Sequence, residues 1–290
     1  MRIFIFGAYS RVGTYLSSHY IQQGHEIIRQ GRSKQAERRF DPLERHMISE
    51  HLSDCTPDII INLIGQTNLS QNERDPELAY RINAGIPEEI SHFINSRSSS
   101  RKPTFIHIST DHLYEGENAS KETEIHPKNV YAMTKLLGDY AALKGFATVL
   151  RTNYIGRSLN RLKPTFTDWV TASLRENKKI KAFEDVSING LHLSTLCSMI
   201  DKTLKFKKTG IYNLGCNGQY TKADIIIYLA EHLGVPLDRV EICKADFADG
   251  VKRPRLMNMD VSKFEREFSV SLPHFSEEFK KLTNDYSIST

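Results

Sequence analysis

A tyrosine and a lysine stand four residues apart, at Tyr131 and Lys135, within the segment VYAMTKLLGDYAALKG. In a helix this spacing places both side chains on one face. A free phenol has a pKa of about 10, which is too high for easy proton exchange at neutral pH, and a nearby ammonium group favours the phenolate. The pair favours Tyr131 as an acid or base catalyst whose pKa Lys135 lowers, while on spacing alone a surface tyrosine beside a solvated lysine stays open.

A hydroxyl group that could act on the same substrate atom follows the run Phe105–Ser109. This run is apolar and β-branched, which predicts a central strand, and its carboxyl end leads into Thr110. Ligands of open α/β sheets bind beside the carboxyl ends of the strands, so we expect Thr110 to polarise a substrate carbonyl that receives hydride. A second pair, Tyr140 and Lys144, would point to the opposite side of the helix.

A glycine-containing turn near the amino terminus predicts a dinucleotide site. Arg2–Phe6 reads as a buried strand, GAYSRVG (7–13) follows it, and an amphipathic helix continues to Gly24. Bare backbone at such a turn lets a pyrophosphate approach the helix N-terminus. The match is partial because Ser10 stands where a middle glycine is usual, and a plain strand-to-helix connection stays open. The residues expected to contact the dinucleotide here are Gly7, Tyr9, Ser10, Arg11, Val12 and Gly13.

The turn after the second predicted strand is basic. We expect His25–Gln30 to form that strand, and Arg32 and Ser33 follow it. A carboxylate at this point would bind ribose hydroxyls and repel a 2′-phosphate, whereas Arg32 and Ser33 could bind the phosphate, with Arg29 or Lys34 assisting. The turn therefore favours NADPH as cofactor, while NADH and a solvated turn without a ligand both stay open.

The order of the remaining predicted elements indicates the fold class. Residues 40–42 read as the end of a third short strand, with Asp41 near the adenine, and Pro57–Leu63 reads as a buried parallel strand. Alternating strands and helices predict an α/β fold of Rossmann type with a doubly wound parallel sheet. We expect residues 1–152 to bind the dinucleotide. Residues 153–290 should form mainly a smaller C-terminal α/β substrate-binding lobe, with some segments returning to the first domain.

Patterns in the second half of the chain are weaker but still define elements. The predicted helices lie at Thr167–Arg175, within Asn189–Asp201, at Lys222–Leu233 and at Val261–Phe268, with a strand at Gly210–Leu214.

Composition and charge limit the classes of function. The chain has 290 residues, 39% hydrophobic and 26% charged, which is typical of a globular protein with a substantial core. The net charge is only +4 and the basic residues are scattered, so nucleic-acid binding is not indicated. The four cysteines lack metal-ligand spacing and suggest neither a metal site nor a disulfide framework. We expect a cytoplasmic protein without a membrane segment.

Together the motifs resemble those of the extended short-chain dehydrogenase/reductase family, and within it the dTDP-4-dehydrorhamnose reductase branch. The resemblance covers nearly the whole chain in the family's order. Its segments are GAYSRVG (7–13), GRS (31–33), PDIIIN (57–62), Asn83-Ala84, ISTDHLYEG (108–116), YAMTK (131–135), LRTNYIG (150–156), YNLGCNGQYT (212–221) and RPRLMNMDVSKFERE (253–267). The sequence departs from the family's pattern at Ser10, Gln66 and His112. The last of these stands where 4,6-dehydratases carry glutamate, so a dehydratase is not favoured.

The resemblance implies roles for individual residues. It implies a catalytic triad of Thr110, Tyr131 and Lys135, in which Lys135 also binds the nicotinamide ribose, and it places Arg151 and Thr152 beside cofactor and substrate. Further implied cofactor contacts are Asp41, Leu63, Gly65, Asn83, Ser109, Tyr131, Lys135 and Thr152. Implied substrate contacts are Gln66, Asp111, His112, Asn153, Trp169, Arg253 and Arg255. Two alternatives stay open: Trp169 could belong to the core, and either of the last two arginines could close a structural ion pair.

These observations lead to one hypothesis with two alternatives. We expect an NADPH-preferring reductase of a nucleotide-linked 4-keto-6-deoxy sugar, with Tyr131 as the proton donor. A nucleotide-sugar epimerase that retains bound NAD would use the same triad, although the basic turn at Arg32 argues against it. A non-catalytic NADP-binding regulatory subunit is the third option, and the intact triad argues against that. A homodimer is also left open.

Overall fold

A six-stranded parallel sheet forms the centre of the molecule, a computed structural model that describes residues 1–32, 34–98, 102–247 and 249–287. The strand order is β10-β5-β4-β3-β1-β2, and every neighbouring pair is parallel. The strands are β1 (Arg2–Phe6), β2 (Glu26–Arg29), β3 (Ile59–Asn62), β4 (Thr104–Ile108), β5 (Thr148–Thr152) and β10 (Gly210–Leu214). The predicted doubly wound Rossmann-type sheet is therefore confirmed.

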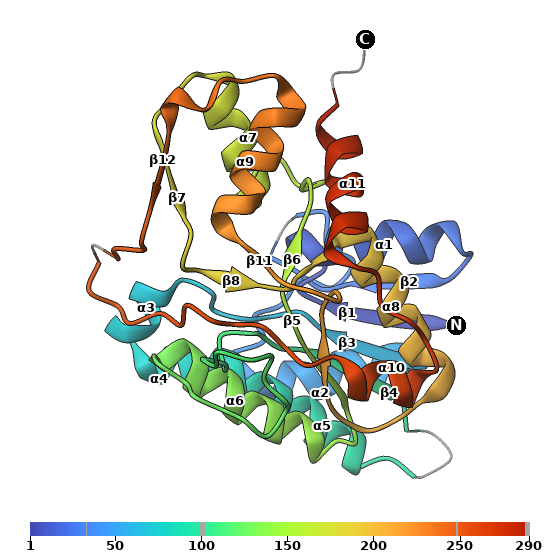
Figure 1. The fold of residues 1–290 in the computed structure, drawn as a ribbon. Coiled ribbons are helices and arrows are strands. Elements are labelled where there is room, and N and C mark those ends of the chain that lie inside the picture. The colour runs from blue at the N-terminus through green and yellow to red at the C-terminus, as the bar shows by residue number, and fades with distance from the viewer. Residues whose placement is uncertain (33, 99–101, 248, 288–290) are drawn as a thin grey trace.

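Alternation along the strands divides the core between the two faces of the sheet. In β1, Ile3 and Ile5 belong to one hydrophobic cluster, and Phe4 and Phe6 belong to the other. Successive side chains of a strand point to opposite faces, so both faces of this sheet need an apolar cover. Helices α1 (Arg11–Gln22) and α8 (Leu193–Phe206) cover one face, and α2 (Arg45–Cys55), α5 (Ile86–Asn95) and α6 (Val130–Leu143) cover the other (Figure 1).

The strand order reverses beside β1, which pairs with β2 on one side and β3 on the other. The turn after β1 and the loop after β3 therefore emerge side by side at the carboxyl edge. Gly7 in the turn is so close to Ile64 in the loop that a Cβ at Gly7 would lie 3.2 Å from Cγ1 of Ile64. Such a switch point is where open α/β sheets bind ligands.

The second half of the chain builds a smaller lobe above the carboxyl edge of the sheet. Helices α7 (Phe166–Arg175) and α9 (Lys222–Leu233) pack beside the parallel pair β7 (Ile180–Phe183) and β12 (Val240–Cys243) (Figure 1). Strand β10 returns from this half to the main sheet. The remaining elements are β6 (Tyr154–Ile155), β8 (Ser187–Ile188), β9 (Leu191–His192), β11 (Tyr220–Thr221), η3 (Leu237–Arg239), α10 (Ser262–Phe268) and α11 (Phe275–Tyr286).

Three expectations about elements need correction. The third strand near Phe40 does not form: a single bridge joins Gln30 to Arg38, and the Asp41 carboxylate accepts a hydrogen bond from the Leu43 backbone N–H, which turns the chain. The helix expected within Asn189–Asp201 begins only at Leu193. Before α5 the sequence pattern predicts one helix around Pro76–Ile82, whereas the chain forms α3 (Leu69–Arg74), α4 (Pro76–Tyr80) and a π-helical turn, η1 (Arg81–Gly85).

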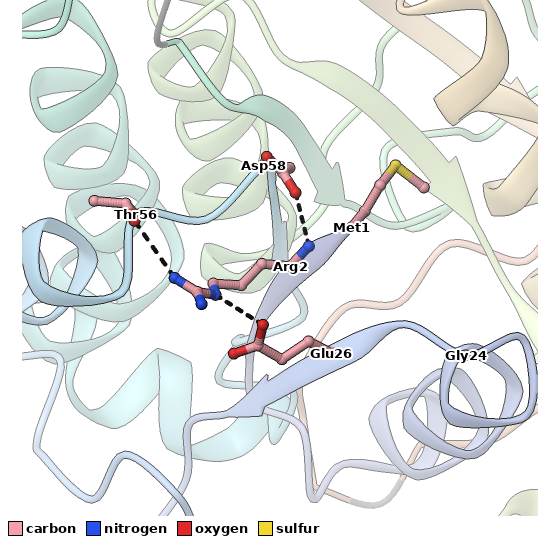
Figure 2. A pocket seen from close by; sticks show the side chains of 6 residues that line it. All are labelled: Met1, Arg2, Gly24, Glu26, Thr56 and Asp58. Carbon is pink, nitrogen blue, oxygen red and sulfur yellow. Dashed lines mark hydrogen bonds and ion pairs between the residues drawn. The ribbon is translucent and has the colours of Figure 1, made fainter.

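A surface hollow of about 390 Å³ lies at the amino ends of β1, β2 and β3, on the edge opposite the switch point (Figure 2). Arg2 joins the three strands there: its guanidinium lies 3.0 Å from Glu26, and its backbone N–H donates to Asp58 at 2.7 Å. These contacts hold the amino ends of the three strands together, so the polar side chains that line the hollow have a structural role. Among the residues described, no helix has both the length and the apolar character needed to cross a membrane.

Candidate active site

Helix α6 carries Tyr131 and Lys135 toward the carboxyl edge of the sheet. Its first turn is fixed by Asn129, whose side chain accepts a hydrogen bond from the Ala132 backbone N–H at 2.9 Å. Tyr131 is 8% exposed and Lys135 is 3% exposed, whereas Tyr140, nine residues further on, is 49% exposed. The second Tyr-Lys pair therefore points to solvent, and the pair that was predicted to be catalytic faces inward.

Close backbone packing holds α6 in place. A Cβ at Gly138 would lie 2.1 Å from the Asn83 carbonyl oxygen in η1, so only glycine fits there. The Asn83 side chain donates to Thr134 Oγ1 at 2.9 Å and accepts from the Gln66 backbone N–H at 2.8 Å. Asn83 was predicted to contact the cofactor, but its amide group is fully buried and occupied by these contacts. It ties the loop after β3 to the catalytic helix.

The Lys135 ammonium group lies under the end of β4. Its Nζ donates to the Ile108 carbonyl at 2.8 Å and lies 3.4 Å from His107 Nε2. Burial lowers the pKa of Lys135 to about 8, and the Asp139 carboxylate one turn further along α6 opposes that shift. Burial, followed by the charge of Lys135, holds the pKa of His107 well below its usual range. At neutral pH, Lys135 is therefore protonated and the neighbouring His107 is neutral.

The pKa of the Tyr131 phenol is shifted in the direction opposite to the one expected. Burial raises its pKa above the usual value of 10, and the charges of Asp111, Tyr154 and Asp139 add to that shift; a hydrogen bond with Thr110 lowers it only in part. The net shift is therefore upward, opposite to the lowering expected from Lys135, whose Nζ donates to the Ile108 carbonyl. Tyr131 is consequently protonated at neutral pH, which is the state that a proton donor requires.

The Tyr131 phenol lies among polar side chains, which are those of Thr110, Asp111, His112 and Asn153. Asn153 Nδ2 donates to the Asp111 carboxylate at 2.6 Å, and the His112 ring lies edge-on to Tyr131 with centroids 5.5 Å apart. Burial raises the pKa of Asp111 to about 7, opposed by the bond from Asn153. Burial also lowers the pKa of His112 to about 4, so this imidazole is neutral at pH 7. Asp111, His112 and Asn153 form one polar group beside Thr110 and Tyr131, and their role as substrate contacts stays a prediction.

The glycine turn has the form that a dinucleotide site needs. Gly7 has a φ of +72°, and a Cβ at Gly13 would lie 2.5 Å from the Gly7 carbonyl, so both positions require glycine. Ser10 instead has a φ of −74° and caps α1 by accepting a hydrogen bond from the Gly13 backbone N–H at 3.0 Å. A serine at the middle position is thus compatible with this turn because its backbone does not need a positive φ.

The other predicted cofactor residues fall into three groups. Leu63, Gly65, Ser109 and Thr152 follow or end the strands β3, β4 and β5 at the switch-point edge. Tyr9 and Arg11 lie in the glycine turn, and Arg32 lies in the turn after β2. The side chain of Val12 is buried in the core and leaves only its backbone for a ligand. Asp41 is exposed in a turn, and Ser33 lies outside the described residues.

Arg151 is not a cofactor contact. Its side chain is fully buried and lies 2.8 Å from the equally buried Asp139 carboxylate, and it also donates to the Tyr114 hydroxyl at 2.9 Å. The predicted contacts Arg253 and Arg255 both close ion pairs, with Asp249 and Asp185 respectively, which was the alternative left open for each. The charge of Arg253 still acts on His112, so Arg253 remains beside the polar group.

A cavity of about 250 Å³ opens in the C-terminal lobe between α7, β7 and α9. Trp169, 49% exposed and 5.9 Å from the Phe166 ring, lines it and does not belong to the core. Lys222, at the first position of α9, was not predicted to be functional. Its charge acts on both Asp111 and His112, so it joins the cavity to the polar group. The cavity is lined by Phe166, Trp169, Lys179, Ile180, Lys181, Phe183 and Lys222.

The fold and this arrangement of side chains define an NAD(P)-dependent oxidoreductase of the short-chain dehydrogenase/reductase type. The family model for the RmlD substrate binding domain matches residues 1–288, so the chain belongs to that family, as the motifs predicted. A probable low-salt glycan biosynthesis reductase from Haloferax volcanii is 25% identical over 99% of this chain and 100% of its own length. The dTDP-4-dehydrorhamnose reductase of Escherichia coli is 25% identical over 100% of this chain and 99% of its own.

A solved structure with the same fold contains a dinucleotide. It is the dTDP-4-dehydrorhamnose reductase from Bacillus anthracis in complex with NADP, with a TM-score of 0.85 at 18% identity over 97% of this chain and 98% of that one.

Proposed function

We propose that this protein is an NADPH-dependent reductase of a nucleotide-linked 4-keto-6-deoxy sugar. The observation that supports the proposal is that Tyr131 is hydrogen-bonded to Thr110 and shares the buried face of α6 with Lys135, whose Nζ donates to the Ile108 carbonyl at the end of β4. Full-length relatives that are named as reductases of such a sugar support the substrate class. The absence of a carboxylate in the segment from Arg29 to Arg32 supports a 2′-phosphate.

The residues of the site divide the chemistry between them. When bound, NADPH supplies the hydride that reduces the ketone. Tyr131, protonated because it is buried, donates a proton to the substrate oxygen, and Thr110 orients that oxygen through a hydrogen bond. The positive charge of Lys135 on the next turn of α6 would stabilise the phenolate that remains, and Lys135 would hold the nicotinamide ribose of the bound cofactor.

The cavity in the C-terminal lobe suits the nucleotide part of the substrate. The rings of Phe166 and Trp169 offer an apolar surface on which a base can stack, and Lys179, Lys181 and Lys222 offer positive charge for a diphosphate. The charge of Lys222 reaches Asp111 in the polar group, so a sugar bound at Tyr131 would extend toward this cavity. Arg253 and Asn153 complete the proposed substrate contacts, with Gln66 on the loop after β3.

Replacing Tyr131 with phenylalanine tests the proposal. The Tyr131→Phe protein should lose turnover by about 100-fold or more, because the proton donor is gone. Its affinity for NADPH should change little. Oxidation of NADPH would be followed with a panel of nucleotide-linked 4-keto sugars, and cofactor binding by calorimetry. Tyr140→Phe, which alters the exposed tyrosine of the same helix, is the matched control and should keep full activity.

Each alternative function has its own outcome in this experiment. An active Tyr131→Phe protein would refute the assignment of the proton donor. No oxidation with any keto sugar, despite normal NADPH affinity, would favour the non-catalytic regulatory subunit. NAD that stays bound through purification would favour the epimerase.

Location and assembly are part of the proposal. We propose a cytoplasmic protein, since Cys55, Cys197, Cys216 and Cys243 are all free thiols. The homodimer stays a prediction, and sedimentation of the purified chain would decide it.

A further inference from the structure

A segment of the C-terminal lobe lies across the glycine turn. This segment, residues 157–164, connects β6 to α7 and is called the latch segment below. Arg11 Nε donates to the carbonyl oxygens of Lys163 and of the next residue, at 3.1 and 2.9 Å. Asn160 Nδ2 donates to the Tyr9 carbonyl at 3.0 Å. Residues about 150 positions apart in the chain therefore meet where the dinucleotide phosphates are expected.

The latch segment brings a lysine to a place that is already basic. Lys163 Nζ donates to the Tyr9 carbonyl at 3.2 Å. Partial burial lowers the pKa of Lys163, and the charges of Arg32 and Arg11 lower it further, so the three cations lie close enough to repel one another. The nearby carboxylate of Glu37 pairs with Arg29 instead. Among the residues that the structure describes, no carboxylate forms an ion pair with Arg11, Arg32 or Lys163, so these three cations are suited to bind an anion.

The position of Tyr9 indicates which phosphate that anion is. The Tyr9 hydroxyl donates to the Gln35 carbonyl at 2.6 Å, and a Cβ at Gly31 would lie 2.6 Å from the Tyr9 ring. Tyr9 is thus packed against the turn that follows β2. The end of this strand binds the adenosine ribose in dinucleotide folds, whereas the pyrophosphate lies at the N-terminus of α1. Arg32 belongs to the turn after β2 and its charge acts on Lys163, so Lys163, which is bonded to the Tyr9 backbone carbonyl, lies between the glycine turn and the ribose side.

We propose that Lys163 completes, with Arg11 and Arg32, the binding site for the 2′-phosphate of NADPH, so that the C-terminal lobe contributes to cofactor selection. This inference rests on the NADPH preference in the proposed function. The three side chains converge from the glycine turn, the turn after β2 and the latch segment. A 2′-phosphate would accept charge-assisted hydrogen bonds from them and relieve their mutual repulsion.

The test compares two dinucleotides that differ only in the 2′-phosphate. Affinities of Lys163→Met for NADPH and NADH would be measured by calorimetry without any sugar. Methionine keeps the length of the apolar stem and removes the charge. We expect the affinity for NADPH to fall about 10- to 100-fold and that for NADH to change by less than about twofold. Arg161→Met, which removes a charge from another exposed position of the latch segment, is the control and should keep the preference.

The remaining outcomes separate this role from others. Equal losses for both dinucleotides would overturn the proposal, since Lys163 would then bind the pyrophosphate or support the fold. Unchanged affinity for NADPH would also overturn it. Lys163→Arg should restore the preference for NADPH, and thermal melting of each variant shows whether the fold is intact. The binding measurement contains no sugar, so a negative result for Lys163 leaves the reductase proposal standing. In the same way, the activity of the Tyr131→Phe protein neither supports nor weakens the role of Lys163.

Discussion

The Asp111 carboxyl group is held in a state that costs stability. It is 2% exposed, and burial raises its pKa to about 7, although the bond from Asn153 and the charge of Lys222 oppose the shift. An unfolded chain would release this proton near pH 4. Between about pH 4 and pH 7 the folded protein thus holds a proton that the unfolded chain has lost, so the free energy of unfolding decreases as the pH rises, by about 1.4 kcal/mol per pH unit from this group.

Asp111→Asn should remove that dependence. The amide oxygen of asparagine can still accept the bond from Asn153, which is 2.6 Å long in the native site, but asparagine does not titrate. We expect the variant to gain stability relative to the native protein as the pH rises from 5 to 7, because only the native protein loses stability through this group. Urea unfolding at several pH values measures the difference. Asp238→Asn, at an exposed carboxyl group, is the control, and parallel pH curves for native protein and Asp111→Asn would contradict the argument.

Residue chemistry was predictable from the sequence where spacing alone determines it. The four-residue spacing of Tyr131 and Lys135 placed both on the inner face of α6. The direction of the Tyr131 pKa was not predictable, because it depends on burial that only the tertiary fold creates. The same holds for Arg151, whose partner Asp139 comes from another element, and for Lys222, which reaches the site through the placement of α9.

Helix α6 depends on one glycine for its position. The Gly138 Cα faces η1, where an added Cβ would lie 2.1 Å from the Asn83 carbonyl oxygen, far inside van der Waals contact. That oxygen belongs to buried backbone and cannot move aside as a flexible side chain would. The close approach lets the Asn83 amide reach Thr134 and so joins α6 to the loop after β3. Any increase in this helix-to-helix distance would shift Tyr131 and Lys135 together.

Gly138→Ala should therefore be harmful, although alanine is normally the better residue inside a helix by about 1 kcal/mol. We expect a loss of about 1–3 kcal/mol in the free energy of unfolding, because α6 must move away from η1. Turnover should fall as well, since the reacting groups lose their alignment. Met133→Ala, at a 51% exposed position of the same helix, should change stability by less than about 0.5 kcal/mol. Urea unfolding and NADPH oxidation measure both effects, and a stabilised, active Gly138→Ala protein would refute them.

Elements were predictable where one local pattern determines both ends. Helix α9 has the predicted bounds, Lys222–Leu233, because Thr221 caps its start and Gly234, in a left-handed conformation, ends it. The strand expected near Phe40 failed because that ring packs against Phe6 in the core while the chain turns at Asp41. Helix α11 was not predicted, since its burial depends on contacts with distant elements such as β9.

The two halves of the molecule share one core. A single hydrophobic cluster contains Ile3 of β1 and Leu16 of α1 together with Phe264 of α10 and Tyr286 of α11. Strand β10 completes the sheet beside β5, and the hydroxyl of Tyr114 from the active-site loop donates to Asn213 Oδ1 in β10 at 2.5 Å. The boundary proposed between residues 152 and 153 therefore does not divide this cluster, and we expect the two halves to depend on each other for stability. Separating the two halves would expose the apolar surface that this shared cluster buries.

This shared core predicts that the whole chain unfolds in one transition. Trp169 is the single tryptophan and lies on α7 in the C-terminal lobe, so its fluorescence reports that lobe, whereas circular dichroism at 222 nm reports the helices of both halves. We expect the two signals to show the same urea midpoint, because separating the lobes would expose the common cluster and leave β5 paired only with β4. A Trp169 transition at clearly lower urea, with most of the dichroism retained, would contradict this prediction. It would mean that the lobe of α7 and α9 unfolds independently, as a separate structural domain does.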